Sequence, residues 1–349
     1  MLSKDEIKNK LALAVQWLIR TIDENGRFNY CYDSTDPSKK INDYNILRHA
    51  GCCYALWQYH NLNEGIINPF IEVVRRYAEK TTDYLINNNL FTTKEKHLVI
   101  VENNSIKTGG IGLSILALLT SDNCYYQGKA SFLVDYILSI QNKDGSLKFH
   151  KKVKDKISNF QSDFYDGEVA LGLLTFAKNS LILTALFKKK IESAAIKLIN
   201  YKYKQSKKNG WTRDHWMVQA IELLDKPTKA QLDFAEQCIN KIIYDPYDLY
   251  KYDVFGSLGC RIEALFSYAN ILEKRIKLQT NKALQKTWIE ERKNIIEHAH
   301  RFIEVSGKGQ IQYGLSMGAW VQNLNSPLVR IDFAQHNISG LIKALQIKE

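Results

Sequence analysis

The feature that most constrains this chain is an alternation between two kinds of helical segment. The first kind begins with a polar or glycine-containing motif and continues as an almost uniformly apolar run. A helix that is apolar on every side must be covered on every side, so these segments are predicted to be buried. They span residues 48–59, 107–119, 165–177, 213–224, 256–269 and 334–345, at intervals of roughly 45–60 residues with a wider last interval of about 78.

The second kind of segment is amphipathic, with apolar residues at three- and four-residue spacing and charges on the opposite side. These segments span residues 7–22, 70–86, 130–141, 188–204, 230–243 and 293–305. Six of each kind in alternation predict an all-α (α/α)6 toroid, in which an outer ring of helices covers an inner ring. An open α-solenoid is the rival, but its helix pairs repeat at shorter intervals of about 34–47 residues.

Composition favours one continuous domain over residues 1–349, because proline is scarce and no Pro/Gly/Ser-rich linker interrupts the chain. The formal net charge of +11 comes largely from lysine runs such as 188–190. We interpret this charge as a solvated surface, since no nucleic-acid-binding motif of fixed spacing accompanies it.

The six cysteines form no CxxC pair, and adjacent Cys52 and Cys53 are predicted to be small core residues. With no signal peptide or 18-residue apolar run, we expect a cytoplasmic protein without a membrane span.

Three loops carry turn signals, at residues 23–30, 141–149 and 207–211. Their Asn-Gly and Asp-Gly pairs favour turns because glycine tolerates positive φ. They resemble the Q-x-x-x-G-x-W/F turns of prenyltransferase and squalene-cyclase toroids. We expect them to tie the end of an outer helix to the next inner helix, which is a structural role.

The inner helices of such a ring run in one direction, so their N-termini meet on one face and form a central cup. Unpaired N–H groups and a partial positive charge at those ends favour anionic or oxygen-rich ligands. The candidate site residues near these ends are Arg48, His49, Lys107, Asp166, Glu168, Asp214, His215, Trp216, Arg261, Glu263, Arg330, Asp332, Gln335, His336 and Asn337.

Each of these residues also has a structural explanation. Asp166 and Asp214 are possible helix N-caps, Asn337 is a possible partner of a backbone carbonyl, and Glu263 is a possible partner of Arg261 in a buried ion pair. Their joint occurrence favours a functional cup, because three of the eight histidines fall close to the predicted start of an inner helix.

Two kinds of acid–base chemistry fit this set. A glycosidase needs two carboxylates, and Asp166 or Glu168 opposite Asp214 or Asp332 would supply them. A sugar epimerase or polysaccharide lyase needs a base and an acid on opposite faces of the carbon that loses its proton, a pairing that His215 and His336, on non-adjacent helices, are predicted to fit. In that case, an arginine such as Arg48 would hold a carboxylate or a carbonyl.

Other site chemistries have weaker support. Asp166 or Glu168 with His215 and His336 would form a His/His/carboxylate zinc set, but no HExxH or comparable spacing accompanies it. A D-x-D-D terpene-cyclase initiator is absent, and so are Walker and Rossmann glycine patterns. The glycines of residues 107–112 are therefore predicted to allow close helix packing or substrate approach. We expect no resident cofactor.

The order of motifs resembles a family of poorly characterised bacterial α/α-toroid proteins. The motifs are "YNILRHAG", "KTGG", "QNKDGSLKF", "YDGEVAL", "DHWMVQAIELL" and "RIDFAQHNISGL". That family is distantly related to the six-hairpin glycosidase and prenyltransferase-like superfamilies, and the resemblance runs from about Trp17 to Leu345. In that family the motif that matches "YDGEVAL" usually reads Tyr-Pro-Gly-Glu, so here Asp166 replaces the proline while Glu168 keeps the glutamate. "DHWMVQAIELL" is also similar to the histidine-containing inner helix of N-acylglucosamine 2-epimerase-type toroids.

These observations predict a carbohydrate-active enzyme, a hydrolase, lyase or epimerase, acting on an acidic or amino-sugar glycan. Arg48 and Arg330 would orient an anionic group, and Glu168 with Asp214 or Asp332 would do acid–base work. His49, His215 and His336 would move protons or hold hydroxyls. The alternatives are a non-catalytic binding or scaffold protein of a glycan or peptide assembly system, and a metal-dependent transferase of the prenyltransferase type.

Overall fold

The computed structural model describes residues 2–41, 43–62, 69–121, 123–154, 156–180 and 184–348. This part of the chain holds twelve α-helices and nine short strands. A search of the same residues finds no helix with the length and apolar character needed to cross a membrane. The predicted all-α (α/α)6 toroid is confirmed, with the strands as additions at its edge.

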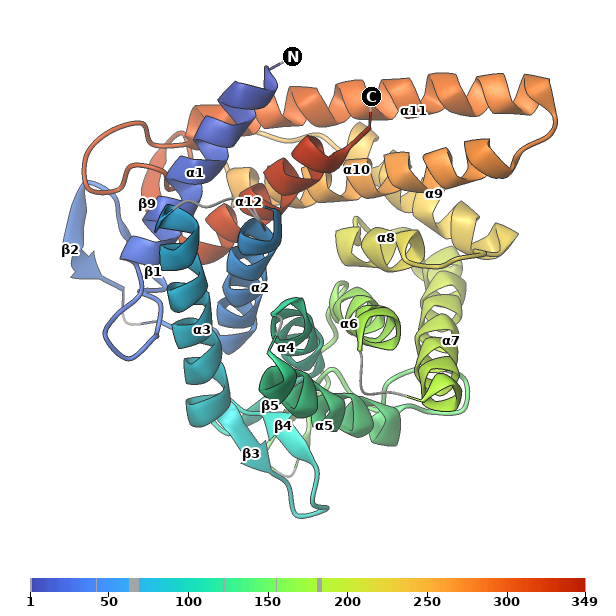
Figure 1. Cartoon of the computed structure of the whole chain (residues 1–349), viewed down its shortest axis with the longest axis horizontal. Helices are drawn as coiled ribbons and strands as arrows, with labels where there is room; N and C mark the ends of the chain where they lie inside the picture. The colour runs from blue at the N-terminus through green and yellow to red at the C-terminus, as the bar shows by residue number, and fades with distance from the viewer. Residues whose placement is uncertain are drawn as a thin grey trace.

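The inner ring consists of the six predicted buried helices. They are α2 (Ile46–Leu62), α4 (Thr108–Thr120), α6 (Tyr165–Asn179), α8 (His215–Glu222), α10 (Val254–Leu278) and α12 (Ile331–Gln346). Each packs against the next along the chain, and α12 packs against α2, which closes the ring. Figure 1 shows these helices around the centre of the molecule. A closed ring rules out the open solenoid, whose first and last repeats do not touch.

The outer helices are α1 (Lys4–Arg20), α3 (Pro69–Asn89), α5 (Cys124–Ile140), α7 (Ala185–Asn209), α9 (Lys229–Tyr244) and α11 (Lys282–Ser306). Each covers an inner helix with its apolar face; α1, for example, buries Ile7, Leu11 and Leu18. Helices α1 and α9 begin with capping boxes, in which the side chain of the N-cap residue and that of the residue three positions later each accept a hydrogen bond from the other's backbone N–H.

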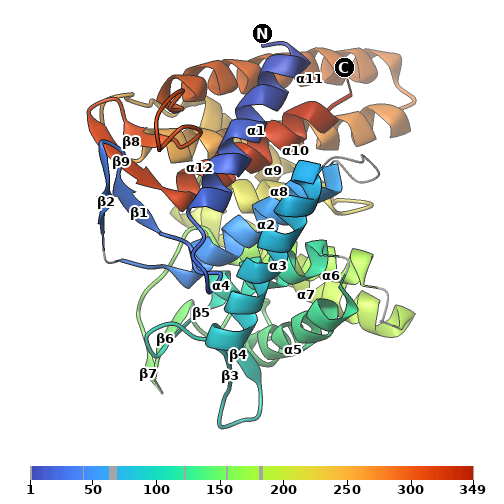
Figure 2. The same ribbon diagram turned by 60° about the vertical axis from the view of Figure 1, so that its left-hand side comes forward.

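The strands lie beside the ends from which several inner helices begin. Strands β1 (Cys31–Asp33), β2 (Asp36–Lys40), β8 (Val321–Asn323) and β9 (Ser326–Arg330) form an antiparallel sheet in the order β2-β1-β9-β8. Strands β3 (Leu90–Thr92) and β4 (Leu98–Ile100) form a hairpin, and β5 (Ser105–Lys107), β6 (Lys151–Val153) and β7 (Lys156–Ile157) form a third sheet. Most of these strands gather on one side of the ring in Figure 2. Because β5 runs directly into α4 and β9 into α12, these sheets fix where those two helices start.

Two of the predicted turns lie against the next outer helix. Gly26 and Gly145 adopt positive φ angles of 90° and 96°, as the Asn-Gly and Asp-Gly signals required. A Cβ on Gly26 would lie 2.3 Å from the carbonyl oxygen of Lys80 on α3, and one on Gly145 equally close to that of Lys197 on α7. The first turn also meets the next inner helix, as predicted, because the centroid of the Phe28 ring lies 4.8 Å from that of His49 on α2.

Glycines bring α4 and α6 into close contact. A Cβ on Gly172 would lie 2.8 Å from the carbonyl oxygen of Gly112, and one on Gly112 would lie 2.6 Å from that of Glu168. The interpretation of the 107–112 glycines as helix-packing residues is thus confirmed. Cys52 and Cys53 are fully buried in α2, as predicted for small core residues. All six cysteines lie within the described residues and are free thiols.

Candidate functional site

A polar cavity of about 260 Å³ opens near the first turns of α2, α8, α10 and α12. Its lining residues are Arg48, Phe164, Arg213, His215, Ile242, Asp253, Gly256, Ser257, Cys260, Arg261, Arg330, Asp332, Phe333 and His336. No residue of α4 is among them, so the cavity lies off the ring axis, on the side of α8, α10 and α12.

Two histidines meet at this cavity with a buried carboxylate between them. The rings of His215 and His336 are 5.1 Å apart between centroids and are nearly perpendicular. Glu263 on α10 is fully buried, and one of its oxygens lies 3.3 Å from Nδ1 of His336 and 3.4 Å from Nε2 of His215. Gln219 donates a long hydrogen bond of 3.5 Å to the same carboxylate. Three inner helices therefore bring an imidazole pair and one shared carboxylate together.

The two histidines have opposite electrostatic environments. Burial, and then the neighbouring His336, lower the pKa of His215 well below its ordinary value. Burial also acts to lower the pKa of His336, but contact with Cys260 and Glu263 raises it well above its ordinary value. These opposite directions favour a neutral His215 beside a protonated His336, a base next to an acid, while burial also raises the pKa of the Glu263 carboxyl between them.

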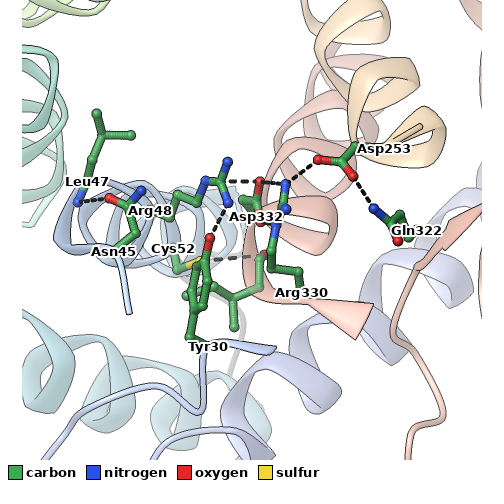
Figure 3. A network of polar contacts seen from close by, with 10 residues as sticks. Tyr30, Asn45, Leu47, Arg48, Cys52, Asp253, Gln322, Arg330 and Asp332 are labelled. Atoms are coloured by element: carbon green, nitrogen blue, oxygen red, sulfur yellow. Dashed lines mark hydrogen bonds and ion pairs between the residues drawn. The ribbon is translucent and has the colours of Figure 1, made fainter. Parts of the chain in front are cut away.

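The cavity is also lined by a network of arginines and aspartates, in which Asp332 lies one turn before His336 on α12. Arg330 makes a two-point contact with Asp332, at 2.6 Å and 3.0 Å, and also donates to Asp253 at 2.8 Å. Nε of Arg48 lies 3.3 Å from Asp332, and its guanidinium also donates to the Tyr30 hydroxyl. Figure 3 shows Asp332 held between the two arginines.

This network sets the charge of Asp332. Burial acts to raise the pKa of Asp332, but Arg48 and Arg330 outweigh it and hold that pKa below its ordinary value. Burial raises the pKa of the Tyr30 hydroxyl to about 12, so this group stays neutral. Asp332 is an ionised, doubly paired carboxylate and a poor proton donor.

Glu168 and Asp214 form a buried acidic pair that is not part of the cavity lining. Burial, and then the charge of Asp214, raise the pKa of Glu168 to about 8, and burial raises that of Asp214 to the same value. One oxygen of each carboxyl has no hydrogen-bond partner among the described residues. The other oxygen of Asp214 caps α8 by accepting from the Met217 N–H at 3.0 Å. Both carboxyls are buried, and neither lines the cavity.

Several predicted site residues point away from the cavity into packed contacts. His49 lies between α2 and α3, where its Nε2 is 2.8 Å from the carbonyl oxygen of Thr81 and burial lowers its pKa to about 4. Lys107 pairs with Glu102 at 2.8 Å. Asp166 contacts His150 at 3.1 Å. The structure does not bring these three predicted side chains to His215 and His336.

The remaining predicted residues lie in the helix packing around the cavity. Asn337 donates to the carbonyl oxygen of Phe255 at 3.0 Å and accepts from Ser306 at 2.6 Å, which ties α12 to α10 and α11. Gln335 packs against Gly51 of α2. Trp216 is buried, with its ring centroid 4.7 Å from that of His215.

Sequence reasoning missed two lining residues that carry chemistry. Cys260 stood in no motif that the sequence analysis singled out, although it precedes Glu263 by three positions and so shares its side of α10. Asp253 stands at the N-cap of α10 but makes no side-chain cap bond, because its carboxylate pairs with Arg330 instead. The position of His336 along its helix also differs from the prediction. Helix α12 begins at Ile331, so His336 lies more than one turn inside the helix and not at its start.

The predicted zinc set is not the one that the structure brings together. Asp166 pairs with His150 and lies 3.6 Å from Lys202 on α7, and Glu168 is buried and does not line the cavity. The group that accompanies His215 and His336 instead is Cys260.

Comparison with known proteins finds similarity in structure only. No protein-family model matches the chain, and no curated protein matches its sequence. A D-mannose isomerase matches with a TM-score of 0.67 and 13% identity, over 99% of this chain and 98% of the other. A cellobiose 2-epimerase from Bacillus thermoamylovorans B4167 matches with a TM-score of 0.69 and 14% identity, over 98% of both chains.

A third similar structure is an inactive variant of an α-1,6-mannanase from Salegentibacter sp. HEL1_6. Its TM-score is 0.62 and its identity 12%, over 99% of both chains. At such identities the likeness establishes the fold. The resemblance to six-hairpin glycosidase-like toroids is thereby confirmed at the level of the fold, and the three neighbours are carbohydrate-active enzymes by name.

Proposed function

We propose that this protein is a sugar isomerase that moves a proton between the first two carbons of an acidic aldose. The observation that carries the proposal is the contact between His215 and His336 at the cavity, with Glu263 placed between their ring nitrogens. Proton transfer next to a carbonyl needs a neutral base and a protonated acid within reach of one substrate, and these two imidazoles supply them.

The reaction begins when the base takes a proton from carbon. When His215 carries its proton on Nε2, beside Glu263, its Nδ1 is free to accept the proton from C2 of an open-chain aldose. His336 donates a proton to the carbonyl oxygen on C1, and a neutral enediol forms. His336 then takes the proton from the oxygen on C2, and His215 returns its proton to C1. The product is the ketose, with both histidines restored.

Glu263 is a positioning residue in this scheme. Its carboxylate faces Nδ1 of His336, which leaves the other ring nitrogen to face the cavity. A carboxylate in this place stabilises the imidazolium form and fixes the ring orientation. The same carboxylate lies near His215, so it also holds the base in place.

The contact between the two histidine rings favours isomerisation over epimerisation. A 2-epimerase must return the proton to the opposite face of C2, and so needs a second proton donor on the other side of the sugar. The sequence predicted His215 and His336 on opposite faces of that carbon, whereas their ring centroids lie only 5.1 Å apart. An acid and a base in contact are suited to returning the proton to the face from which it left.

A glycosidase has less support from this geometry. It needs two carboxyls flanking the scissile bond, one protonated and one ionised. The carboxylates that line the cavity, Asp253 and Asp332, are both paired with Arg330. Glu168 and Asp214 have the raised pKa of a general acid, but both are buried and neither lines the cavity.

Charge and size support an acidic monosaccharide as the substrate. Four arginines and two aspartates line the cavity, so positive charge is in excess. Arg213 is half exposed and pairs with Asp245 at 2.7 Å, which leaves part of its guanidinium free for an anionic ligand group. A cavity of about 260 Å³ is small by comparison with sites for drug-sized ligands, about 300–1,000 Å³. It fits one sugar unit better than a polymer.

The test is a panel of uronic acids, aldose phosphates and neutral aldoses, incubated with the protein in D2O and followed by proton NMR. Isomerisation is expected to give ketose and to place deuterium on C1 or C2 of an acidic sugar. His215→Gln and His336→Gln are each expected to slow this at least 100-fold, by loss of general acid–base catalysis. His97→Gln, in the β3–β4 turn, is the control and is expected to retain full activity.

The same assay decides between the alternatives. Arg213→Gln is expected to raise KM for the acidic sugar while leaving KM for a neutral aldose unchanged. Epimer formation without ketose would identify an epimerase, and cleavage of an oligosaccharide by the unmodified protein would identify a glycosidase. Sugar binding without any deuterium exchange would favour the non-catalytic binding protein and refute the isomerase.

A further inference from the structure

We infer that His215, Cys260 and His336 form a binding site for a thiophilic divalent metal ion such as Zn²⁺. Each residue offers one ligand atom, and the three atoms lie within 4.8 Å of one another. They come from α8, α10 and α12, three helices whose packing holds the group together without any loop.

An independent observation points to a ligand at this place. Nδ1 of His215 has no hydrogen-bond partner among the described residues, and its Nε2 has only the 3.4 Å approach to Glu263, although the residue is only 3% exposed. A buried polar atom without a partner costs about 1–3 kcal/mol. Coordination by one of these nitrogens would remove part of that cost, so the group has a physical reason to accept a metal ion.

The donor set selects the kind of metal. Two imidazoles and one thiolate are ligands of zinc sites, and a thiolate disfavours Mg²⁺ and Ca²⁺, which prefer oxygen. Ligand atoms around tetrahedral zinc lie about 3.3–3.8 Å apart, so the three side chains need to close by roughly 1 Å. Cys260 and His336 both line the cavity, which leaves a further position for water or for a substrate oxygen.

Glu263 supports the site from behind. Its carboxylate lies 3.3 Å from Nδ1 of His336 and orients that ring toward the cavity. Metal-bound histidines commonly donate their second N–H to a carboxylate in this way.

The consequence for activity rests on the proposed isomerase. A metal ion on His215 and His336 occupies the nitrogens that would carry the protons. Bound Zn²⁺ would therefore stop the proton transfer, and chelation would restore it. Metal binding itself does not depend on that function, so the two are tested separately.

The binding test uses the purified full chain, stripped with a chelator and titrated with Co²⁺ under anaerobic conditions. A thiolate–Co²⁺ charge-transfer band is expected in the near ultraviolet, together with intense visible bands that indicate tetrahedral coordination. Saturation at one ion per chain and loss of the bands on adding Zn²⁺ are expected. No sugar is present, so the result is independent of whether the protein is an isomerase.

Two variants assign the ligands. Cys260→Ser is expected to lose the charge-transfer band, and His215→Gln to weaken Co²⁺ binding at least 10-fold. Cys124→Ser, which removes an exposed thiol on α5, is the matched control and should bind like the unmodified chain. A Zn²⁺-dependent rise in the Tm of the unmodified chain provides a second readout that needs no variant. Absence of the band, its retention in Cys260→Ser, its loss in Cys124→Ser, or an unchanged Tm would overturn the site.

Discussion

Replacing Glu168 by glutamine should change the pH dependence of stability by an amount that follows from its burial. In the folded protein burial and the charge of Asp214 raise the pKa of Glu168 from 4.5 to about 8. Between these two values the folded state binds a proton that the unfolded state has released. The stabilisation from this group is therefore full below about pH 4.5 and is lost as the pH rises toward 8.

The magnitude follows from the linkage relation. Each pH unit between the two pKa values costs the wild type about 1.4 kcal/mol of unfolding free energy, and the full interval costs about 5 kcal/mol. Glutamine has nearly the same shape and does not titrate. If the substitution also destabilises the protein for reasons unrelated to titration, that loss of unfolding free energy is the same at every pH. It does not change the slope of unfolding free energy against pH.

The assay is urea unfolding of the wild type and of Glu168→Gln at several values between about pH 5 and pH 8. The free energy of the variant minus that of the wild type should rise by about 1.4 kcal/mol per pH unit. Glu72→Gln, which changes a largely exposed carboxyl on α3, is the control and should shift stability by less than about 0.5 kcal/mol. A difference that stays flat with pH would show that Glu168 ionises normally in the folded state, and the reasoning from its burial would be wrong.

Two further substitutions test what holds the ring together. Gly26→Ala should lower the unfolding free energy by about 2–4 kcal/mol, because its φ is 90° and the new Cβ would meet a backbone oxygen at 2.3 Å. Gly128→Ala, with open space around it in α5, should instead raise that free energy by about 0.5–1 kcal/mol; equal effects in urea unfolding would contradict the assignment of the turns. Asn337→Ala removes the partner of the Phe255 carbonyl and of the Ser306 hydroxyl and should cost about 2–4 kcal/mol. A Tm unchanged from the wild type would show that these groups find other partners.

The ring was predictable because its signal is local and repeated. Each inner helix is apolar on all sides, so its burial can be read from a dozen residues without knowledge of its neighbours. Helix ends were less accurate. Helix α12 begins three residues before the expected segment, since β9 leads directly into it, and α8 ends at Glu222 a few residues before Pro227.

The sequence predicted which types of residue form the candidate site, but not which individual side chains meet at the cavity. His49 follows Arg48 at the start of α2, yet the two side chains point in different directions. His49 contacts α3, whereas Arg48 points toward the cavity. Adjacent residues on a helix are separated by about 100° around its axis, so the dipeptide could not act as one unit. Lys107 and Asp166 have partners close by, and these partners lie in segments that carried no signal of their own.

The sequence by itself determined the alternating layers, the all-α toroid and the face on which polar side chains collect, because hydrophobic periodicity and helix polarity are properties of short segments. Only the tertiary structure decided that Glu263 stands between His215 and His336, that Cys260 joins them, and that Asp332 is held by two arginines. These relations depend on the rotation of each helix about its axis. That rotation is set by the packing of all six inner helices at once, and no single segment encodes it.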